Sequence, residues 1–377
     1  MLTVNESINE YLKRKGIKDD EADINIILYK SIYNNHFKKF KCVLKYAINY
    51  NVFLEINRVY SYENEKTDPL TLFAKYDFYE ITKLLIFYAN KNNIVLEVNR
   101  KDDEGMNPLL YTISKASNFK MMKLLIDYAT KNNIFLKIND KNNYGEYPLL
   151  FTAIKNNIKK VEILMLYAIK SSIVLKINDK TNYGFYPLLC SIKINNIEMI
   201  KLLIVYSNSN NLILKVNEDD KDGNYPFLCA TLNNNIDVMK LLIEYARFNN
   251  IVLKVNERNY YRNYQLLFSI LNNNIDIVKL LIEYANENHI ILKINENNND
   301  GNYPLLSSIL NNNIDIIKLL IEYAENNSIL LKINEKNHQG NYPFLKIVEN
   351  DNIEIMKLLL NYSTKYGVIL DINEKDH

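Results

Sequence analysis

Hydrophobic and polar residues follow one pattern that returns about every 39 residues, and residues 301–334 show it clearly as GNYPLLSSILNNNIDIIKLLIEYAENNSILLKIN. After Pro304 the apolar residues keep the i, i+1, i+4, i+5 spacing of a short helix with one buried face. They are Leu305, Leu306, Ile309 and Leu310. Because proline is tolerated at the first helical position, the pattern predicts a helix that begins at Pro304.

A second helix is predicted from near Ile314, after three asparagines, 311–313, that favour turns and caps. It carries two apolar stripes, which indicate burial on two sides, as for a helix between neighbouring units. The stripes are Ile314/Ile317/Ile321/Ala324 and Ile316/Leu320/Tyr323. Beyond this helix, apolar residues alternate through 329–333 and predict a short extended segment.

The closing asparagine of this pattern recurs at an interval that is constant from Asn139 onward and slightly longer before it. Its copies are Asn57, Asn99, Asn139, Asn178, Asn217, Asn256, Asn295, Asn334 and Asn373. All seven prolines occupy one position of the period, and six of the eight glycines lie three residues before a proline. Glycine supplies the positive φ of a tight turn, so each unit is predicted to run turn, helix, helix. A fixed period of this length is typical of a solenoid.

The motif G-x-Y-P-L-L, followed by N-N-x-I-[DE]-[IV]-x-K-L-L-I-E-Y-A and a closing [IV]-N, resembles the ankyrin repeat over about residues 26–373. Tyrosine replaces the threonine before the family's proline, leucine replaces its histidine, and about six extra residues precede the closing asparagine. The resemblance implies an all-α, ankyrin-like solenoid of about nine stacked helical hairpins joined by β-turn or hairpin loops. We expect residues 1–25 to form an N-terminal capping helix and residues 26–377 to form a single repeat array.

Composition narrows the classes of function. The net charge is only +2, with 46 basic and 44 acidic residues, which argues against a nucleic-acid or anionic-membrane surface. The opening segment MLTVNESINEYLKRKG shows no secretory signal, and no apolar run approaches the length of a membrane-spanning helix, so we expect a cytoplasmic protein. Three cysteines are too few for a disulfide framework. Cys190 and Cys229, at one position of adjacent copies, are either a redox pair or two small packed residues.

The position three residues after each proline varies from copy to copy, while its neighbours hardly depart from Leu and Phe. By the ankyrin resemblance this column faces the concave surface, where it would contact a partner. Packing against the next layer is the alternative, because each residue lies one turn from core leucines. The column comprises Leu72, Tyr111, Phe151, Cys190, Cys229, Phe268, Ser307 and Lys346.

Two turns depart from the pattern. Residues 58–68 form a longer turn with Tyr60 and Tyr62, and the turn at 258–262 has lost its glycine, as the next helix has lost its proline. The second turn carries Arg258, Tyr260, Tyr261 and Arg262. Either these turns are simply relaxed, or they contact a partner, since Tyr and Arg are enriched at binding hot spots.

No constellation predicts catalysis. The four histidines, His36, His289, His338 and His377, lie in different units and not at metal-ligand spacing, so we expect neither a metal site nor a cofactor. We therefore expect a non-catalytic, monomeric scaffold that binds a protein partner through its concave face and turn tips. The alternative is a structural spacer without a binding site of its own, and an enzyme ranks behind both.

Overall fold

The computed structural model describes residues 6–371 except 20, 22, 34–35, 63–64 and 116–118; for Tyr33 and residues 60–62 and 65, which lie in regular elements, it describes the backbone alone. The chain forms two compact units, an N-terminal unit over Met1–Asn182 and a C-terminal unit over Tyr183–His377, and each is described by itself. The single array predicted over residues 26–377 stays a prediction. No helix in the described part of the chain is long and apolar enough to span a membrane.

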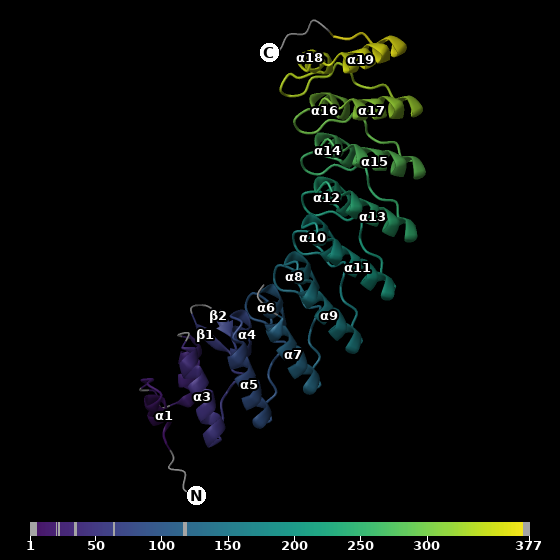
Figure 1. Cartoon of the computed structure of the whole chain (residues 1–377). Coiled ribbons are helices and arrows are strands. Elements are labelled where there is room, and N and C mark those ends of the chain that lie inside the picture. Colours follow the sequence, from purple (N-terminus) through teal and green to yellow (C-terminus); the bar gives the residue numbers. More distant parts are fainter. Residues whose placement is uncertain are drawn as a thin grey trace. The chain divides into compact units, whose positions relative to one another are not determined.

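The described residues form nineteen helices and one two-stranded antiparallel sheet (Figure 1). In the N-terminal unit they are α1 (Ile8–Arg14), α2 (Ile24–Tyr33), α3 (Phe37–Tyr50), β1 (Tyr60–Tyr62), β2 (Glu65–Thr67), α4 (Pro69–Lys75), α5 (Tyr79–Lys91), α6 (Pro108–Ser114), α7 (Lys120–Lys131), α8 (Pro148–Ile154) and α9 (Ile158–Lys170). In the C-terminal unit they are α10 (Pro187–Lys193), α11 (Ile197–Ser209), α12 (Pro226–Leu232), α13 (Ile236–Phe248), α14 (Gln265–Leu271), α15 (Ile275–Glu287), α16 (Pro304–Leu310), α17 (Ile314–Asn326), α18 (Pro343–Glu349) and α19 (Ile353–Tyr366).

Nine of the helix pairs in the described residues are hairpins, from α2/α3 to α18/α19, which confirms the all-α solenoid architecture that the sequence predicts. Within each unit, first helices from α4 onward contact the next first helix, and second helices contact second helices from α3 to α9 and from α15 to α19, so the hairpins stack as layers (Figure 1). Both apolar stripes of α17 are buried or half-buried, as two-sided packing requires. On α16, Leu305, Leu306 and Ile309 are buried, but Leu310, expected on the same face, is exposed.

The helix boundaries follow local chemistry. Proline is the first residue of every first helix from α4 onward except α14, which begins at Gln265. The second helices from α9 onward are capped by an asparagine whose side chain accepts a backbone N–H of the first turn. Between the helices of one hairpin, an asparagine such as Asn312 takes the left-handed conformation, at φ 52°. Asparagine tolerates that conformation better than most residues do.

The three asparagines between α16 and α17 have three different tasks. The side chain of Asn311 donates to the carbonyl of Ile270 in the preceding hairpin at 2.6 Å. Asn312 makes the left-handed turn, and Asn313 caps α17 while donating to Asn273 Oδ1 at 2.6 Å. The triplet therefore ends one helix, starts the next and bonds the layer to its neighbour.

Helix α1 lies outside the repeats and packs on α3. Ser7 and Glu10 cap its start reciprocally, and Gly16 follows its end at φ +75°. Leu12 is fully buried, and the hydroxyl of Tyr46 in α3 donates to the carbonyl of Glu6 at 2.8 Å. The capping role expected of residues 1–25 stays a prediction.

Two glycines with similar backbones allow a matched test of layer contact. Gly301 has φ +78°, and a Cβ there would lie 2.9 Å from the Cα of Asn337 in the next turn. Gly367 has φ +65° and nothing within 4 Å. We predict that Gly367→Ala lowers the free energy of unfolding by about 1–2 kcal/mol through backbone strain alone. Gly301→Ala should cost clearly more, because two backbones must also move apart. Urea unfolding followed by circular dichroism compares the variants, and equal losses would contradict the close approach.

Candidate functional site

The segment that follows each second helix is extended, and side chains of neighbouring hairpins hold it. The closing asparagine of the preceding hairpin bonds it twice: Asn256 Nδ2 donates to the carbonyl of Ile291 at 2.8 Å, and its Oδ1 accepts the N–H of Lys293 at 3.0 Å. The same pair of hydrogen bonds is made by Asn57, Asn99, Asn139, Asn217, Asn295 and Asn334. The closing asparagine thus aligns successive segments.

A tyrosine of the following hairpin's second helix holds the same segment from the other side. Tyr323 in α17 accepts the N–H of Leu292 at 2.9 Å. Equivalent bonds to buried leucines are made by Tyr88, Tyr128, Tyr167, Tyr245, Tyr284 and Tyr362. Burial raises the pKa of Tyr323 above its ordinary value, so this hydroxyl stays protonated at neutral pH.

From Tyr147 to Tyr303, the tyrosine immediately before each first helix also bonds to the next hairpin. Tyr303 donates its hydroxyl hydrogen to the carbonyl of Glu335 at 3.0 Å, and Tyr147, Tyr186, Tyr225 and Tyr264 make equivalent bonds. Each of these tyrosines is the N-cap residue of its own helix, but its side chain makes no hydrogen bond to the first turn of that helix. The tyrosine that replaces threonine at this position therefore exchanges a bond within the hairpin for one between hairpins.

Four turn tips are built on a buried asparagine, three positions before the glycine or, at Asn259, before Arg262. In the turn before α16, Asn298 Oδ1 accepts the N–H groups of Asp300 and Asn302, both at 3.0 Å. Asn142, Asn259 and Asn337 do the same in their own turns. The turn residues beyond the buried asparagine are thereby fixed while their side chains point to solvent.

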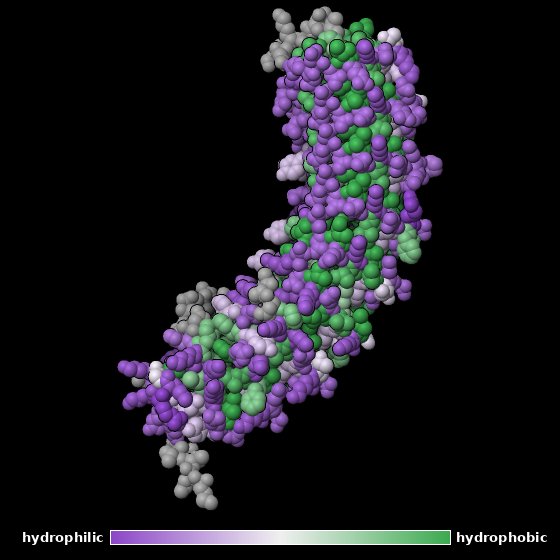
Figure 2. Space-filling view, viewed as in Figure 1, coloured by the Kyte–Doolittle hydropathy of each residue, from purple (hydrophilic) through white to green (hydrophobic). Residues whose placement is uncertain are grey.

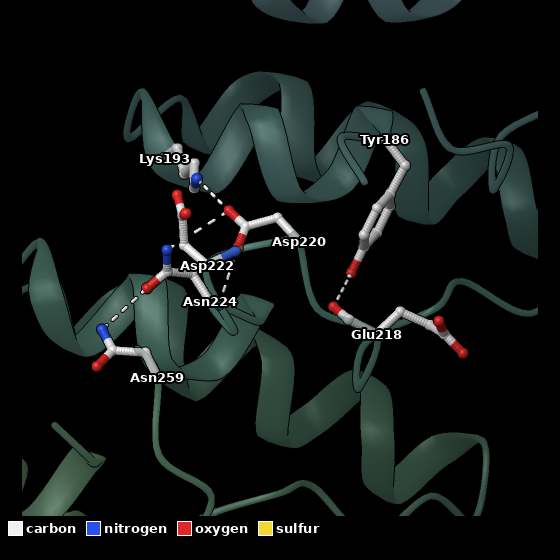
Figure 3. Close-up of polar contacts among 7 residues, drawn as sticks. All are labelled: Tyr186, Lys193, Glu218, Asp220, Asp222, Asn224 and Asn259. Carbon is white, nitrogen blue, oxygen red and sulfur yellow. Dashed lines mark hydrogen bonds and ion pairs between the residues drawn. The ribbon is translucent and has the colours of Figure 1, made fainter. Parts of the chain in front are cut away.

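Aspartate replaces this asparagine at Asp220, where Figure 3 shows Lys193 of α10 reaching its carboxylate. Asp220 is almost completely buried, and its Oδ1 accepts the N–H groups of Asp222 and Asn224. Burial alone would raise the pKa of Asp220, but the hydrogen bonds from Lys193 and from the backbone of Asn224 outweigh it and hold the pKa below its ordinary value. The ion pair therefore compensates a buried charge.

The aspartate in the turn occurs together with a lysine at the end of the preceding first helix. Where the turn residue is aspartate, at Asp102 and Asp220, the last residue of the preceding first helix is lysine, Lys75 and Lys193 respectively. Where the turn residue is Asn259, Asn298 or Asn337, the equivalent helix residue is leucine, at Leu232, Leu271 and Leu310. The two positions change together because an unpaired carboxylate in this turn would lose its hydration.

The varied column on the first helices is mostly buried. Leu72, Tyr111, Phe151, Cys190, Cys229 and Ser307 are buried, whereas Phe268 and Lys346 are half-buried. Tyr111 illustrates the reason, because its ring lies 5.7 Å from Lys75 Nζ of the preceding hairpin and its hydroxyl donates to Asp102. The burial favours the alternative of packing between layers, and a partner-binding role for this column stays a prediction.

The two buried cysteines have the chemistry of packed residues. Burial raises the pKa of Cys190 and that of Cys229 to about 12. Both thiols therefore stay protonated at neutral pH, and a protonated thiol is a poor nucleophile. The structure holds both as free cysteines, which favours packing over a redox pair.

The altered turn at 258–262 has three exposed side chains and one that is held by an ion pair. Tyr260 and Tyr261 are 77% and 60% exposed, with their rings 5.6 Å apart in a T-shaped arrangement, and Arg262 is exposed at φ +59° in the place of glycine. Arg258 is instead held by an ion pair with Glu296. In the other altered turn, Tyr60 and Tyr62 lie on β1, and their side chains are outside the described part of the chain.

Two buried polar residues escaped the sequence patterns. Gln265, in the place of proline, accepts the hydroxyl of Tyr225 at 2.9 Å and donates to the carbonyl of Lys254 at 2.9 Å. Lys160 is fully buried in α9, and its ammonium donates to the carbonyls of Thr112 and Lys115 at the end of α6. The signal for Lys160 was a charged residue at a helix position that is Met199, Val238 or Ile277 in later copies.

A family model of ankyrin repeats matches residues 70–175, 167–254 and 188–293 of the chain. Together these spans cover residues 70–293, which is 224 of 377 residues and more than half of the sequence. No curated protein sequence matches the chain.

The ion pair at the turn before α12 predicts a pH-dependent stability. Lys193→Leu should lower the free energy of unfolding at pH 7 by about 1–3 kcal/mol, because it removes a charged hydrogen bond from a buried carboxylate. Lys193→Leu combined with Asp220→Asn should recover most of the loss, since it restores the leucine and asparagine found in later hairpins. The folded-state pKa of Asp220 lies below its unfolded value, so the pair stabilises above the unfolded pKa of about 4 and loses this effect as the pH falls through the folded value.

Urea unfolding at pH 7 and at pH 3 tests the ion-pair prediction. The advantage of the wild type over Lys193→Leu should shrink at the lower pH. A single variant as stable as the wild type at pH 7 would show that the carboxylate needs no partner.

Lys160 predicts a second stability effect. Lys160→Met should lower the free energy of unfolding by about 1–3 kcal/mol, because the buried carbonyl of Thr112 and the partly buried carbonyl of Lys115 lose their donor. Lys155→Met, at an exposed position of the same hairpin, serves as the matched control and should change stability by less than about 0.5 kcal/mol. Thermal unfolding of both variants measures the difference, and a neutral Lys160→Met would contradict the capping role.

Proposed function

The chain belongs to the ankyrin repeat family, and from that premise we propose that it is a non-catalytic scaffold that binds a protein partner. Ankyrin repeats generally serve as protein–protein interaction modules and generally carry no enzymatic activity. The partner contact that we propose is the turn at 258–262 in the C-terminal unit. The exposed Tyr260 and Tyr261 pair is the observation that supports it.

The turn is held rigid before any partner arrives. Asn259 Oδ1 accepts the N–H groups of Tyr261 and Asn263, both at 3.1 Å, and the N–H of Tyr260 donates to the carbonyl of Asp222 in the preceding turn at 2.9 Å. Ordering loops and side chains on binding costs free energy, so a preformed tip binds with less loss. Tyrosine supplies a large contact area and a hydrogen-bonding hydroxyl, and exposed arginine adds a charged donor.

The burial of the first helices narrows the footprint within the C-terminal unit. Cys190, Cys229 and Ser307 expose too little surface to contribute much to partner binding. Phe268 is half-buried and lies on α14, the helix that follows the turn at 258–262. We propose that Phe268 joins the turn as the partner-contacting residue of its column. Tyr60 and Tyr62 on β1 are proposed as a separate contact in the N-terminal unit.

Affinity capture with the intact chain tests this proposal. Combined Tyr260→Ala, Tyr261→Ala and Arg262→Ala should lower the recovery of a captured partner at least tenfold, because the exposed anchors are lost while the buried Asn259 stays. Phe268→Ala should lower it by a smaller factor. Phe248→Ala, an equally exposed aromatic residue at the end of α13, is the matched control and should leave recovery unchanged.

Circular dichroism confirms that each variant keeps its helices. Unchanged recovery by the triple variant would exclude this turn as the contact. A chain that retains no protein from any source would instead favour the structural spacer.

A further inference from the structure

A second feature of the surface is one large, exposed apolar side chain in every hairpin, four residues before the closing asparagine. In the N-terminal unit these are Phe53, Val95, Phe135 and Val174. In the C-terminal unit they are Ile213, Val252, Ile291, Leu330 and Ile369, and we call these five the apolar row. All nine are between 52% and 85% exposed. Figure 2 shows hydrophobic residues reaching the surface of the C-terminal unit between hydrophilic ones.

The position two residues later has the opposite chemistry. It is exposed or half-buried in every hairpin, and it is always charged. In the C-terminal unit it is lysine four times, at Lys215, Lys254, Lys293 and Lys332, which we call the lysine row. Because both positions belong to the same extended segment and both face solvent, exposure alone cannot explain why one is always apolar and the other always charged. A binding surface requires such a division, whereas a solvated loop does not.

The two rows are held side by side by the backbone. Residues two apart in an extended segment point to the same side and lie about 6.6 Å apart, while Leu253 and Val255 between and beside them point into the core. Asn217 bonds both the carbonyl of Val252 and the N–H of Lys254, so it fixes one member of each row to the preceding hairpin. The apolar row and the lysine row therefore run parallel to each other within the C-terminal unit, and hydrogen bonds fix their positions.

The spacing between successive residues of each row matches the repeat of a helical ligand. Packed helix layers repeat every 8–10 Å or so, and an α-helix rises about 10.5 Å in seven residues. Apolar residues seven apart on a helix would therefore meet successive members of the apolar row. Acidic residues on the flank of the same helix would lie over the lysine row.

The charge beyond the lysine row limits the width of the ligand. The residue after each closing asparagine is an exposed glutamate in the C-terminal unit, at Glu218, Glu257, Glu296 and Glu335. A broad anionic surface such as a lipid bilayer would meet these carboxylates as well as the lysines, which is unfavourable. A single helix about 10 Å wide aligns its carboxylates with the lysine row rather than with the glutamates. One of these glutamates, Glu335, lies 3.9 Å from Lys332, so an acidic ligand must compete with it there.

We propose that the apolar and lysine rows of the C-terminal unit bind an acidic amphipathic helix of a partner protein. The helix lies along the row from Ile213 to Leu330, with its apolar face on the row and its carboxylates on the lysines. This surface is different from the turn at 258–262. The proposal rests on the proposed function only in assuming that the ligand is a protein.

Two synthetic peptides, each long enough to form a helix that passes all four hairpins from Ile213 to Leu330, test the proposal on the full chain. Both carry leucine at helical positions of one face, and they differ only in having glutamate or lysine along the flank of that face. We expect the acidic peptide to bind at least tenfold more tightly than the basic one in fluorescence anisotropy at physiological ionic strength. Combined Ile291→Glu and Leu330→Glu should weaken the acidic peptide at least tenfold, and combined Lys293→Glu and Lys332→Glu should reverse the preference between the peptides.

Controls separate this surface from its alternatives. Tyr260→Ala with Tyr261→Ala should leave peptide binding unchanged, because the turn lies outside both rows. All these side chains are exposed, so circular dichroism should show no loss of helix. Failure of both peptides, equal binding of both, or binding of phosphatidylserine vesicles in place of the peptides would overturn the proposal. Failure of the peptides while the turn variant still loses its captured partner would refute the rows alone and leave the proposed turn contact standing.

Discussion

Side chains of two other hairpins hold the extended segments at Leu96, Leu136, Leu253, Leu292 and Leu331, one from each side. The N–H of Leu253 is bonded by Tyr284 of the following hairpin, and the N–H of Lys254 by Asn217 of the preceding one. Backbone groups without partners cost free energy when they are buried, so a hairpin alone would leave these groups unpaired or in water. Stability is therefore shared between nearest neighbours, as in repeat proteins generally.

The same bonds explain one departure of this chain from the ankyrin pattern. The extra residues before the closing asparagine form the extended segment, and its tyrosine and asparagine partners occur once in every period. Asparagine and tyrosine are thus abundant because they cap helices, form turns and make the hydrogen bonds between hairpins. Because the backbone is held from within, the side chains of the turn tips differ between hairpins, while the exposed segment positions keep either an apolar or a charged side chain. These exposed positions, such as Tyr260 and Leu330, carry the proposed contacts.

Local chemistry made much of the fold predictable. Pro304 set the start of α16, the asparagines at 311–313 separated it from α17, and the closing asparagines counted the units. Other features depended on residues far away in the sequence. The burial of Tyr111 follows from contact with the preceding hairpin. Gln265 replaces the proline of the neighbouring repeats, and its bonds to Tyr225 and Lys254 depend on packing that the local sequence does not contain. Lys160 likewise reaches carbonyls 45–48 residues earlier.

The sequence by itself determined the hairpins, their number and their order, because turns, caps and helix periodicity act over a few residues and recur in each copy. The tertiary structure decided which side chains remain available to a partner. Exposure is a property of adjacent layers: Phe151 and Phe268 occupy one position of the repeat, yet only the second is half-open to solvent. The pairing of Asp220 with Lys193 was visible as two substitutions, but only the packing of one layer on the next made them a single interaction.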